Sequence, residues 1–118
     1  MNHHEQVMKP WGSYRVLSNK DRYKVKIIEV KPLQRISLQR HSKREEHWII
    51  VQGLAKVTLN KNLHTLQLGD SIIIKQKDIH RVENPSATTT LLFIEVQIGY
   101  YLEEDDIERF EDDYGRIK

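Results

Sequence analysis

The feature that most constrains the fold is a succession of short β-type segments, separated by turn residues, that covers most of the chain. Residues 23–30 read YKVKIIEV, a nearly alternating segment rich in β-branched residues. Further segments of this kind span residues 48–51, 55–59, 63–68, 71–74, 81–84 and 88–96. Turn signals separate them, including Gly53, the NKN of residues 60–62 and the LGD of residues 68–70. Short strands with turns about every 8 to 12 residues predict an all-β sandwich or barrel.

The two ends of the chain depart from this pattern. We expect residues 1–8 to be a mobile start, and Pro10 and Gly12 disfavour regular structure just after it. Residues 103–118 are rich in acidic side chains, and Ile107 and Phe110 stand three apart. Because acidic side chains stabilise the first turn of a helix, this segment predicts a short C-terminal helix. The whole chain, residues 1–118, is expected to be one domain.

Composition excludes several classes of function. The chain has 118 residues, no cysteine and a formal net charge of +2. That length is enough to bury a core without disulfides, and the lack of cysteine favours a reducing cytoplasm. The small net charge, with basic residues spread along the chain, gives no argument for nucleic acid as a partner. No segment approaches the roughly 18 apolar residues of a membrane span, and the first residues do not resemble a signal peptide.

Four polar residues have the types and spacing of a metal site. Gln39 and His41 stand two apart, which places both side chains on one face of a strand. Glu46 would begin the next strand, and His80 would open a later one. These nitrogen and oxygen donors suit a divalent metal, zinc first and manganese, cobalt, nickel or iron as well. A single histidine would be read more simply as a polar residue capping a strand, but the joint spacing favours a metal site. Outside this spacing lie His3, His4, His47 and His64.

This spacing resembles the two motifs of the cupin superfamily. Written out, it is Gln39-x-His41-x4-Glu46-x6-Gly53, followed by Gly69-x5-Lys75-x-Lys77-x2-His80-x3-Asn84. Cupins usually have histidine where Gln39 stands, and proline and glycine where Lys75 and Lys77 stand. The resemblance implies a double-stranded β-helix, or jelly roll, with Gln39, His41, Glu46 and His80 as metal ligands. Cupins commonly pair through their sheets, so the resemblance also implies a homodimer.

Longer stretches carry a closer resemblance. They read KPWGSY (9–14), ISLQRH (36–41), REEHWIIVQG (44–53), HRVENP (80–85), IEVQIG (94–99), and EDDIERF with DDYGR (104–110 and 112–116). Together they resemble the C-terminal isomerase domain of type II phosphomannose isomerases, which usually follows a mannose-1-phosphate guanylyltransferase domain. No nucleotidyltransferase segment precedes Pro10, so we expect a stand-alone isomerase half.

The resemblance implies a metal-dependent isomerase that interconverts mannose 6-phosphate and fructose 6-phosphate through an enediol. The metal would stabilise the developing oxyanion. Arg44, in the loop between His41 and Glu46, is the expected catalytic residue, because its guanidinium suits phosphate or an enediolate. Lys43, Arg109 and Arg116 are the expected substrate-binding residues, the two arginines only if the tail folds over the barrel mouth. The simpler interpretation of each is a solvated or locally paired charge.

A second hypothesis stays open beside the isomerase. It is a non-catalytic cupin that binds a sugar phosphate or a nucleotide sugar and acts with a separate guanylyltransferase. Ser42 and Lys43 stand where the related family often has histidines, and Lys75 and Lys77 replace the usual turn residues, so both departures favour it. Neither nucleic acid nor a membrane is expected as a partner. The sequence leaves the metal, the proton-transfer base and the sugar open.

Overall fold

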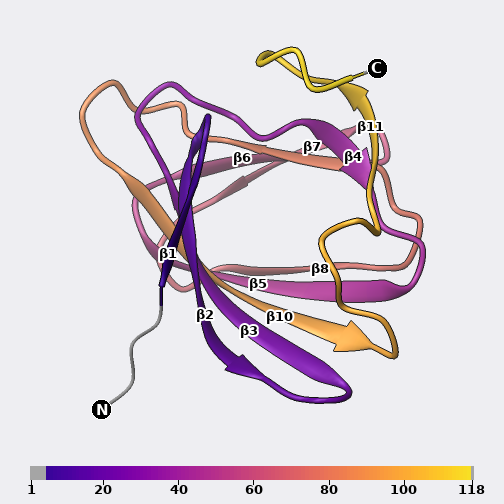
Figure 1. Ribbon diagram of the computed structural model, residues 1–118. Helices are drawn as coiled ribbons and strands as arrows, with labels where there is room; N and C mark the ends of the chain where they lie inside the picture. The colour runs from indigo at the N-terminus through magenta and orange to yellow at the C-terminus, as the bar shows by residue number, and fades with distance from the viewer. Residues whose placement is uncertain (1–4, 118) are drawn as a thin grey trace.

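The structure is a computed structural model that describes residues 5–117 as strands and turns, with no helix among them (Figure 1). Consequently, no helix in this range could cross a membrane. The strands are β1 (Gln6–Lys9), β2 (Gly12–Asn19), β3 (Tyr23–Val30), β4 (Leu38–Arg40), β5 (Arg44–Gln52), β6 (Ala55–Leu59), β7 (Asn62–Leu66), β8 (Ser71–Ile74), β9 (His80–Glu83), β10 (Leu91–Gly99) and β11 (Glu108–Glu111).

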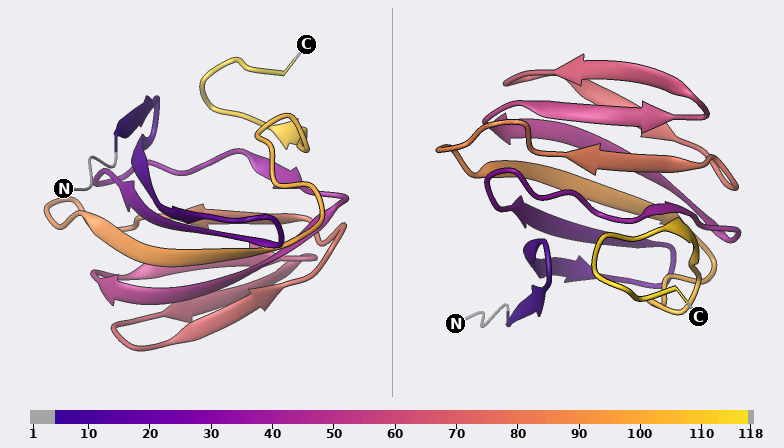
Figure 2. Two further views of the ribbon diagram at one scale, coloured as in Figure 1. Left: turned by 60° about the horizontal axis from the view of Figure 1, so that its bottom comes forward. Right: turned by 90° about the horizontal axis from the view of Figure 1, so that it is seen from above.

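The strands form two antiparallel sheets that face each other (Figure 2). The larger sheet has the order β1-β2-β3-β10-β5-β8, and the smaller has the order β11-β4-β9-β6-β7. Strands distant in sequence therefore lie side by side, as where β10 pairs with both β3 and β5. The prediction of an all-β jelly roll is confirmed.

The predicted C-terminal helix is wrong. Residues 108–111 form strand β11, which pairs with β4 in the smaller sheet. Arg40 Nε donates to Glu108 Oε1 at 2.8 Å, and Arg81 Nη1 donates to Glu111 Oε1 at 3.1 Å. The acidic side chains therefore bind arginines of other strands, and these tertiary contacts override a weak local helix preference.

The N-terminal segment also differs from the expectation. Residues 6–9 pair with residues 12–15 as a β1–β2 hairpin, in the segment where Pro10 and Gly12 had suggested irregular structure. Pro10 lies in the two-residue turn between the strands and Gly12 begins β2, so both are compatible with a hairpin. His3 and His4 lie outside the described residues.

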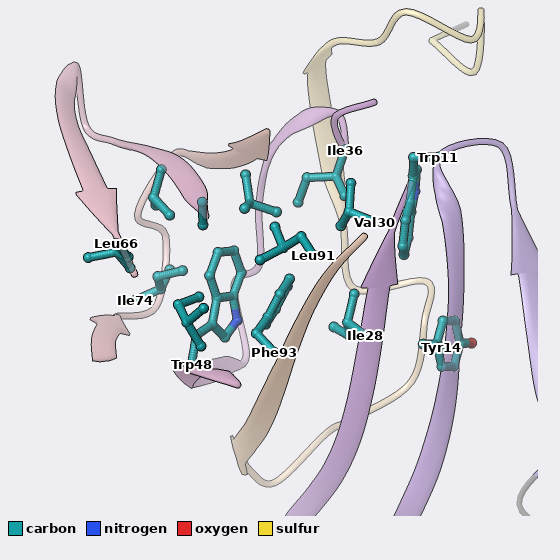
Figure 3. Close-up of a cluster of buried hydrophobic side chains, with 14 residues drawn as sticks. Trp11, Tyr14, Ile28, Val30, Ile36, Trp48, Leu66, Ile74, Leu91 and Phe93 are labelled. Carbon is teal, nitrogen blue, oxygen red and sulfur yellow. The ribbon is translucent and has the colours of Figure 1, made fainter. Parts of the chain in front are cut away.

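The barrel interior is divided into an apolar half and a polar half. The inward residues of β3, β5 and β10 are apolar at one end of each strand, where Trp48 and Phe93 pack with ring centroids 4.7 Å apart (Figure 3). Towards the other end, the inward positions of the same three strands become charged or polar and stay buried. They are Lys24 and Lys26 on β3, Arg44 and Glu46 on β5, and Glu95 and Gln97 on β10.

Candidate metal and ligand site

The buried polar side chains in this half of the barrel lower the stability of the fold. Burying charged groups away from water is unfavourable unless they are paired or bind a ligand. Cross-strand register places Glu95 directly between Lys26 and Trp48, and Gln97 between Lys24 and Glu46. Six buried polar side chains on three adjacent strands are not needed to close a β-barrel, and this end of the interior is therefore the candidate site.

His41, Glu46 and His80 converge in this half. His41 Nε2 lies 3.3 Å from Glu46 Oε2, and His80 Nε2 lies 3.8 Å from Glu46 Oε1. One donor atom from each of the three residues falls within 4.8 Å of the others. His41 follows β4, Glu46 lies on β5 and His80 opens β9, so the two sheets bring the triad together. The structure thus unites three of the four metal ligands that the sequence predicted.

Both imidazoles turn their Nε2 atoms towards this centre. The Nδ1 atoms of His41 and His80 lie 2.7 Å and 2.9 Å from the backbone oxygens of Asp106 and Asp78. Since a carbonyl oxygen only accepts, each Nδ1 carries a proton, and Nε2 is the ring nitrogen that faces Glu46. Burial lowers the pKa of His80 against the opposing effect of Glu46, which keeps this ring neutral. Imidazoles held in this way by a carbonyl are typical of metal ligands.

His80 carries the strongest sign that a ligand belongs here. Its side chain is fully buried, yet its Nε2 has no hydrogen-bond partner among residues 5–117. A buried acceptor without a partner costs about 1–3 kcal/mol. Two aimed imidazoles beside a carboxylate fit a divalent metal, which would satisfy this atom and neutralise Glu46.

Gln39 lies beside the triad, directly opposite His80 across the β4–β9 pair. Its Nε2 is 3.2 Å from His41 Nε2, and its Oε1 accepts the Ser37 hydroxyl at 2.6 Å. The amide would offer its oxygen to a metal only after turning over, so Gln39 as a fourth ligand stays a prediction.

Arg44 contacts the same atoms that would hold a metal. Its Nε and Nη2 donate to Glu46 Oε2 at 2.9 Å and 2.8 Å, and Nη2 lies 3.4 Å from His41 Nε2. Burial alone would raise the pKa of Glu46, but the positive charge around it, that of Arg44 included, holds this pKa far below its usual value. Glu46 is therefore an ionised carboxylate, and a guanidinium and a metal would compete for it.

Glu95 is a functional candidate that the sequence analysis missed. Trp48 Nε1 donates to both Glu46 Oε1 and Glu95 Oε1, at 3.1 Å and 3.0 Å, and Gln97 Nε2 donates to Glu95 Oε2 at 2.9 Å. Burial, with the adjacent Glu46 charge, raises the pKa of Glu95 to about 8. A protonated acid and an ionised one thus stand side by side. The alternation of residues 91–97 places Glu95 on the inward face of the strand, and this pattern could have identified it from the sequence.

One pocket leads from this centre to the surface. Its floor includes Gln39, His41, Arg44 and Glu46, and its rim includes Lys9, Arg109 and Arg116. The tail therefore does fold over the barrel mouth, and both predicted arginines line the pocket. Lys43 does not line it, because its ammonium lies over the Tyr101 ring at 4.4 Å from the centroid. A role for Lys43 in binding stays a prediction, and Lys9 was missed because it lies far away in sequence.

Comparisons with known proteins agree with the fold. A family model described as mannose-6-phosphate isomerase C-terminal matches residues 1–112. A solved RmlC-like cupin from Shewanella frigidimarina aligns with a TM-score of 0.75 at 16% identity, covering 86% of this chain and 87% of that one. A Klebsiella pneumoniae protein with a double-stranded β-helix domain aligns with a TM-score of 0.70 at 20% identity, covering 82% of this chain and 77% of that one. The cupin fold is confirmed.

Similar proteins in sequence are much longer than this chain. The mannose-1-phosphate guanylyltransferase ManC of Salmonella typhimurium is 46% identical over 97% of this chain, but only 24% of its own length is covered. The alginate biosynthesis protein AlgA of Pseudomonas putida is 50% identical over 96% of this chain and 23% of its own length. The chain thus spans about a quarter of the length of these relatives.

The names of the relatives correct one expectation. The predicted main function, interconversion of mannose 6-phosphate and fructose 6-phosphate, is not what these relatives are named for. ManC is named for guanylyl transfer to mannose 1-phosphate and AlgA for alginate biosynthesis. These names describe the whole relatives, and they favour the hypothesis of a domain that accompanies a guanylyltransferase over that of an isomerase.

Proposed function

Since the chain belongs to the family described as mannose-6-phosphate isomerase C-terminal, we propose that it is a non-catalytic cupin module that binds a sugar phosphate or a nucleotide sugar and acts with a mannose-1-phosphate guanylyltransferase. The observation that carries this proposal is one pocket with a metal-ligand set on its floor and cationic side chains at its rim. A phosphorylated sugar would present its hydroxyl oxygens to the metal and its phosphate oxygens to the cationic side chains.

The state of the carboxyl groups supports binding rather than proton transfer. Three glutamates line the pocket: Glu46, Glu95 and Glu104. Glu46 accepts hydrogen bonds from Arg44 and Trp48, and the raised pKa of Glu95 keeps most of this carboxyl protonated near neutral pH. Glu104 Oε2 lies 2.7 Å from Lys26 Nζ. Each of the three carboxyl groups is therefore paired or mostly protonated in the free protein, which favours a binding role.

Each part of the site has a role in binding. His41, His80 and Glu46 would hold the metal, with zinc as the first expectation, and a bound metal would supply a Lewis acid for a sugar oxygen. Arg44 offers a rigid donor fork to an oxygen of the ligand once Glu46 is neutralised by the metal. Glu95 accepts the N–H groups of Trp48 and Gln97, and when protonated it would also have one O–H to donate. Trp11 and Tyr14 also line the pocket and offer aromatic faces to a sugar ring.

The partners follow from the relatives. The names of ManC and AlgA belong to whole proteins, and this chain matches about a quarter of each. The guanylyltransferase that acts with this module would be either a linked domain or a separate protein. The predicted homodimer stays a prediction. Ile49 and Ile73, 47% and 49% exposed, lie on paired strands of the larger sheet and would suit such a contact.

The test is isothermal titration calorimetry with mannose 1-phosphate and GDP-mannose, in zinc and again in chelator. We expect binding of at least one of the two ligands that is tighter in zinc, and no binding of unphosphorylated mannose. Turnover of mannose 6-phosphate by the metal-loaded protein would contradict the non-catalytic assignment. Absence of binding by both phosphorylated ligands would overturn the proposal.

A further inference from the structure

We infer that Lys9 and Arg109 form a phosphate subsite at the rim of this pocket, separate from the metal ligands on its floor. The inference deepens the proposed function and rests on it for the sugar, although not for the phosphate group itself. The phosphate would belong to a sugar phosphate or to the diphosphate of a nucleotide sugar. The contacts and charges at the rim carry the argument.

The pocket is lined by more positive than negative charge. Besides Arg44, four cationic side chains line it, Lys9, Lys26, Arg109 and Arg116. Two of them are paired: Lys26 Nζ lies 2.7 Å from Glu104 Oε2, and the Arg116 guanidinium forms a fork on the Asp112 carboxylate at 2.8 Å and 2.9 Å. No ion pair within 4.0 Å joins Lys9 or Arg109 to a carboxylate of residues 5–117. Two positive charges are therefore left over.

Arg109 has a donor that nothing in the described chain satisfies. Its Nε is buried and makes no hydrogen bond within residues 5–117. Burial lowers the pKa of Arg109, and the neighbouring Arg116 lowers it further, against Asp112 and Glu104. A guanidinium with a buried, unpaired N–H and a like charge beside it is costly unless an anion completes it.

Lys9 has the same environment from the other end of the chain. Burial lowers its pKa, and Arg116, Arg109 and Lys26 oppose its charge while Glu104 favours it. Its ammonium also lies 5.9 Å from the Tyr14 ring centroid. Lys9 comes from β1 and Arg109 from β11, and both views of Figure 2 place these strands on the same side of the barrel. The two ends of the chain thus offer their cations to one pocket.

The surplus matches a phosphate. A phosphate monoester carries about −1.5 to −2 charges at neutral pH, which would balance two unpaired cations. An arginine fork and a lysine point charge are the usual donors to such a group. With the phosphate at the rim, the sugar would extend towards Arg44 and the triad on the pocket floor. The rim would then bind the phosphate end of the ligand, and the floor would bind the sugar end.

The test compares Arg109→Gln and Lys9→Gln with Arg22→Gln, which removes an exposed cation outside this pocket. Each is titrated with inorganic phosphate, mannose 1-phosphate, GDP-mannose and unphosphorylated mannose, in chelator so that phosphate cannot bind metal. Losing one charge-assisted contact should weaken phosphate and sugar-phosphate binding about tenfold to a hundredfold. Arg22→Gln should leave both affinities unchanged.

Thermal unfolding without phosphate separates a binding role from a structural one. Because Arg109 is repelled and unpaired, Arg109→Gln should keep or raise the melting temperature of the free protein, and it should remove the stabilisation that phosphate gives to the wild type. A lower melting temperature with unchanged phosphate binding would assign Arg109 to the fold and overturn the subsite. An equal loss of binding in Arg22→Gln would show a general charge effect and overturn it as well.

The outcomes for the two proposals are distinct. If the wild type binds inorganic phosphate through Arg109 but neither phosphorylated sugar, the subsite stands and the proposed function falls. If it binds mannose 1-phosphate and both variants bind as tightly, the proposed function stands and the subsite falls. If the wild type binds no phosphate ligand, both are overturned.

Discussion

Replacing Arg44 by methionine should make the protein dependent on zinc for stability. Arg44 and Glu46 are a buried ion pair, with side chains 6% and 2% exposed and Nη2 2.8 Å from Oε2. Removing one partner of such a pair leaves an uncompensated buried charge, which costs about 3–5 kcal/mol. Trp48 Nε1 still donates to Glu46 but cannot neutralise it. In chelator, we therefore expect Arg44→Met to lose about 3–5 kcal/mol of unfolding free energy.

Zinc should return much of this loss. A ligand at a hundred times its dissociation constant stabilises the native state by about 2.7 kcal/mol. In the wild type, zinc must displace a guanidinium from Glu46, whereas in Arg44→Met the carboxylate is free. The stabilisation by zinc should therefore be larger in the variant than in the wild type.

Urea denaturation followed by tryptophan fluorescence, in chelator and in zinc, measures both terms. Arg40→Met is the matched control, because Arg40 pairs with the exposed Glu108 and should cost less than about 1 kcal/mol in either condition. Combining Arg44→Met with His80→Ala should abolish the zinc effect. If zinc stabilises the wild type as much as Arg44→Met, the guanidinium and the metal do not compete, and the reasoning is refuted.

Three further predictions follow from the same geometry. His41→Ala and His80→Ala should each lose bound zinc in elemental analysis, and stoichiometric zinc in both variants would show that the ligand set is wrong. In chelator, the folded-state pKa of Glu95, about 8 against an ordinary 4.5, makes the wild type lose stability as the pH rises from 4.5 to 8. Glu95→Gln should remove that loss, so urea midpoints of wild type and variant that fall equally between these pH values would contradict it. The Asp106 carboxylate accepts the N–H groups of Ser42 and Lys43 at 2.9 Å and 3.0 Å, and its carbonyl orients His41. Asp106→Ala should therefore weaken zinc affinity about tenfold to a hundredfold in a chelator competition assay, and unchanged affinity would exclude this support.

The strands were predictable where local pattern decided them. Residues 23–30, 55–59 and 71–74 alternate or cluster β-branched side chains, and the structure begins and ends these strands at the same residues. The acidic tail was not predictable in this way. Its helical signal was local. In the structure, Arg40 and Arg81, which are far away in sequence, bind Glu108 and Glu111 and stabilise this segment as a strand.

The site divides along the same line. His41, Glu46 and His80 were found because each falls at a fixed distance from a turn in the chain. The alternation of residues 91–97 could have shown that Glu95 faces inward, but its raised pKa comes from burial and from Glu46 on the neighbouring strand, which the local sequence does not show. Lys9 and Arg109 meet only after both ends of the chain have folded onto the barrel, so their shared pocket depends on topology and not on spacing.

The contacts between the tail and the site have a consequence for folding kinetics. The oxygen that orients His41 is 65 residues away in sequence, and the carboxylate that pairs with Lys26 is 78 residues away. Contacts between such distant residues close long loops, which costs conformational entropy. We therefore expect these contacts to form late in folding. The binding pocket should therefore be absent from the folding transition state. Zinc or a phosphorylated sugar would then prolong the lifetime of the native protein by slowing unfolding, while leaving the rate of folding unchanged.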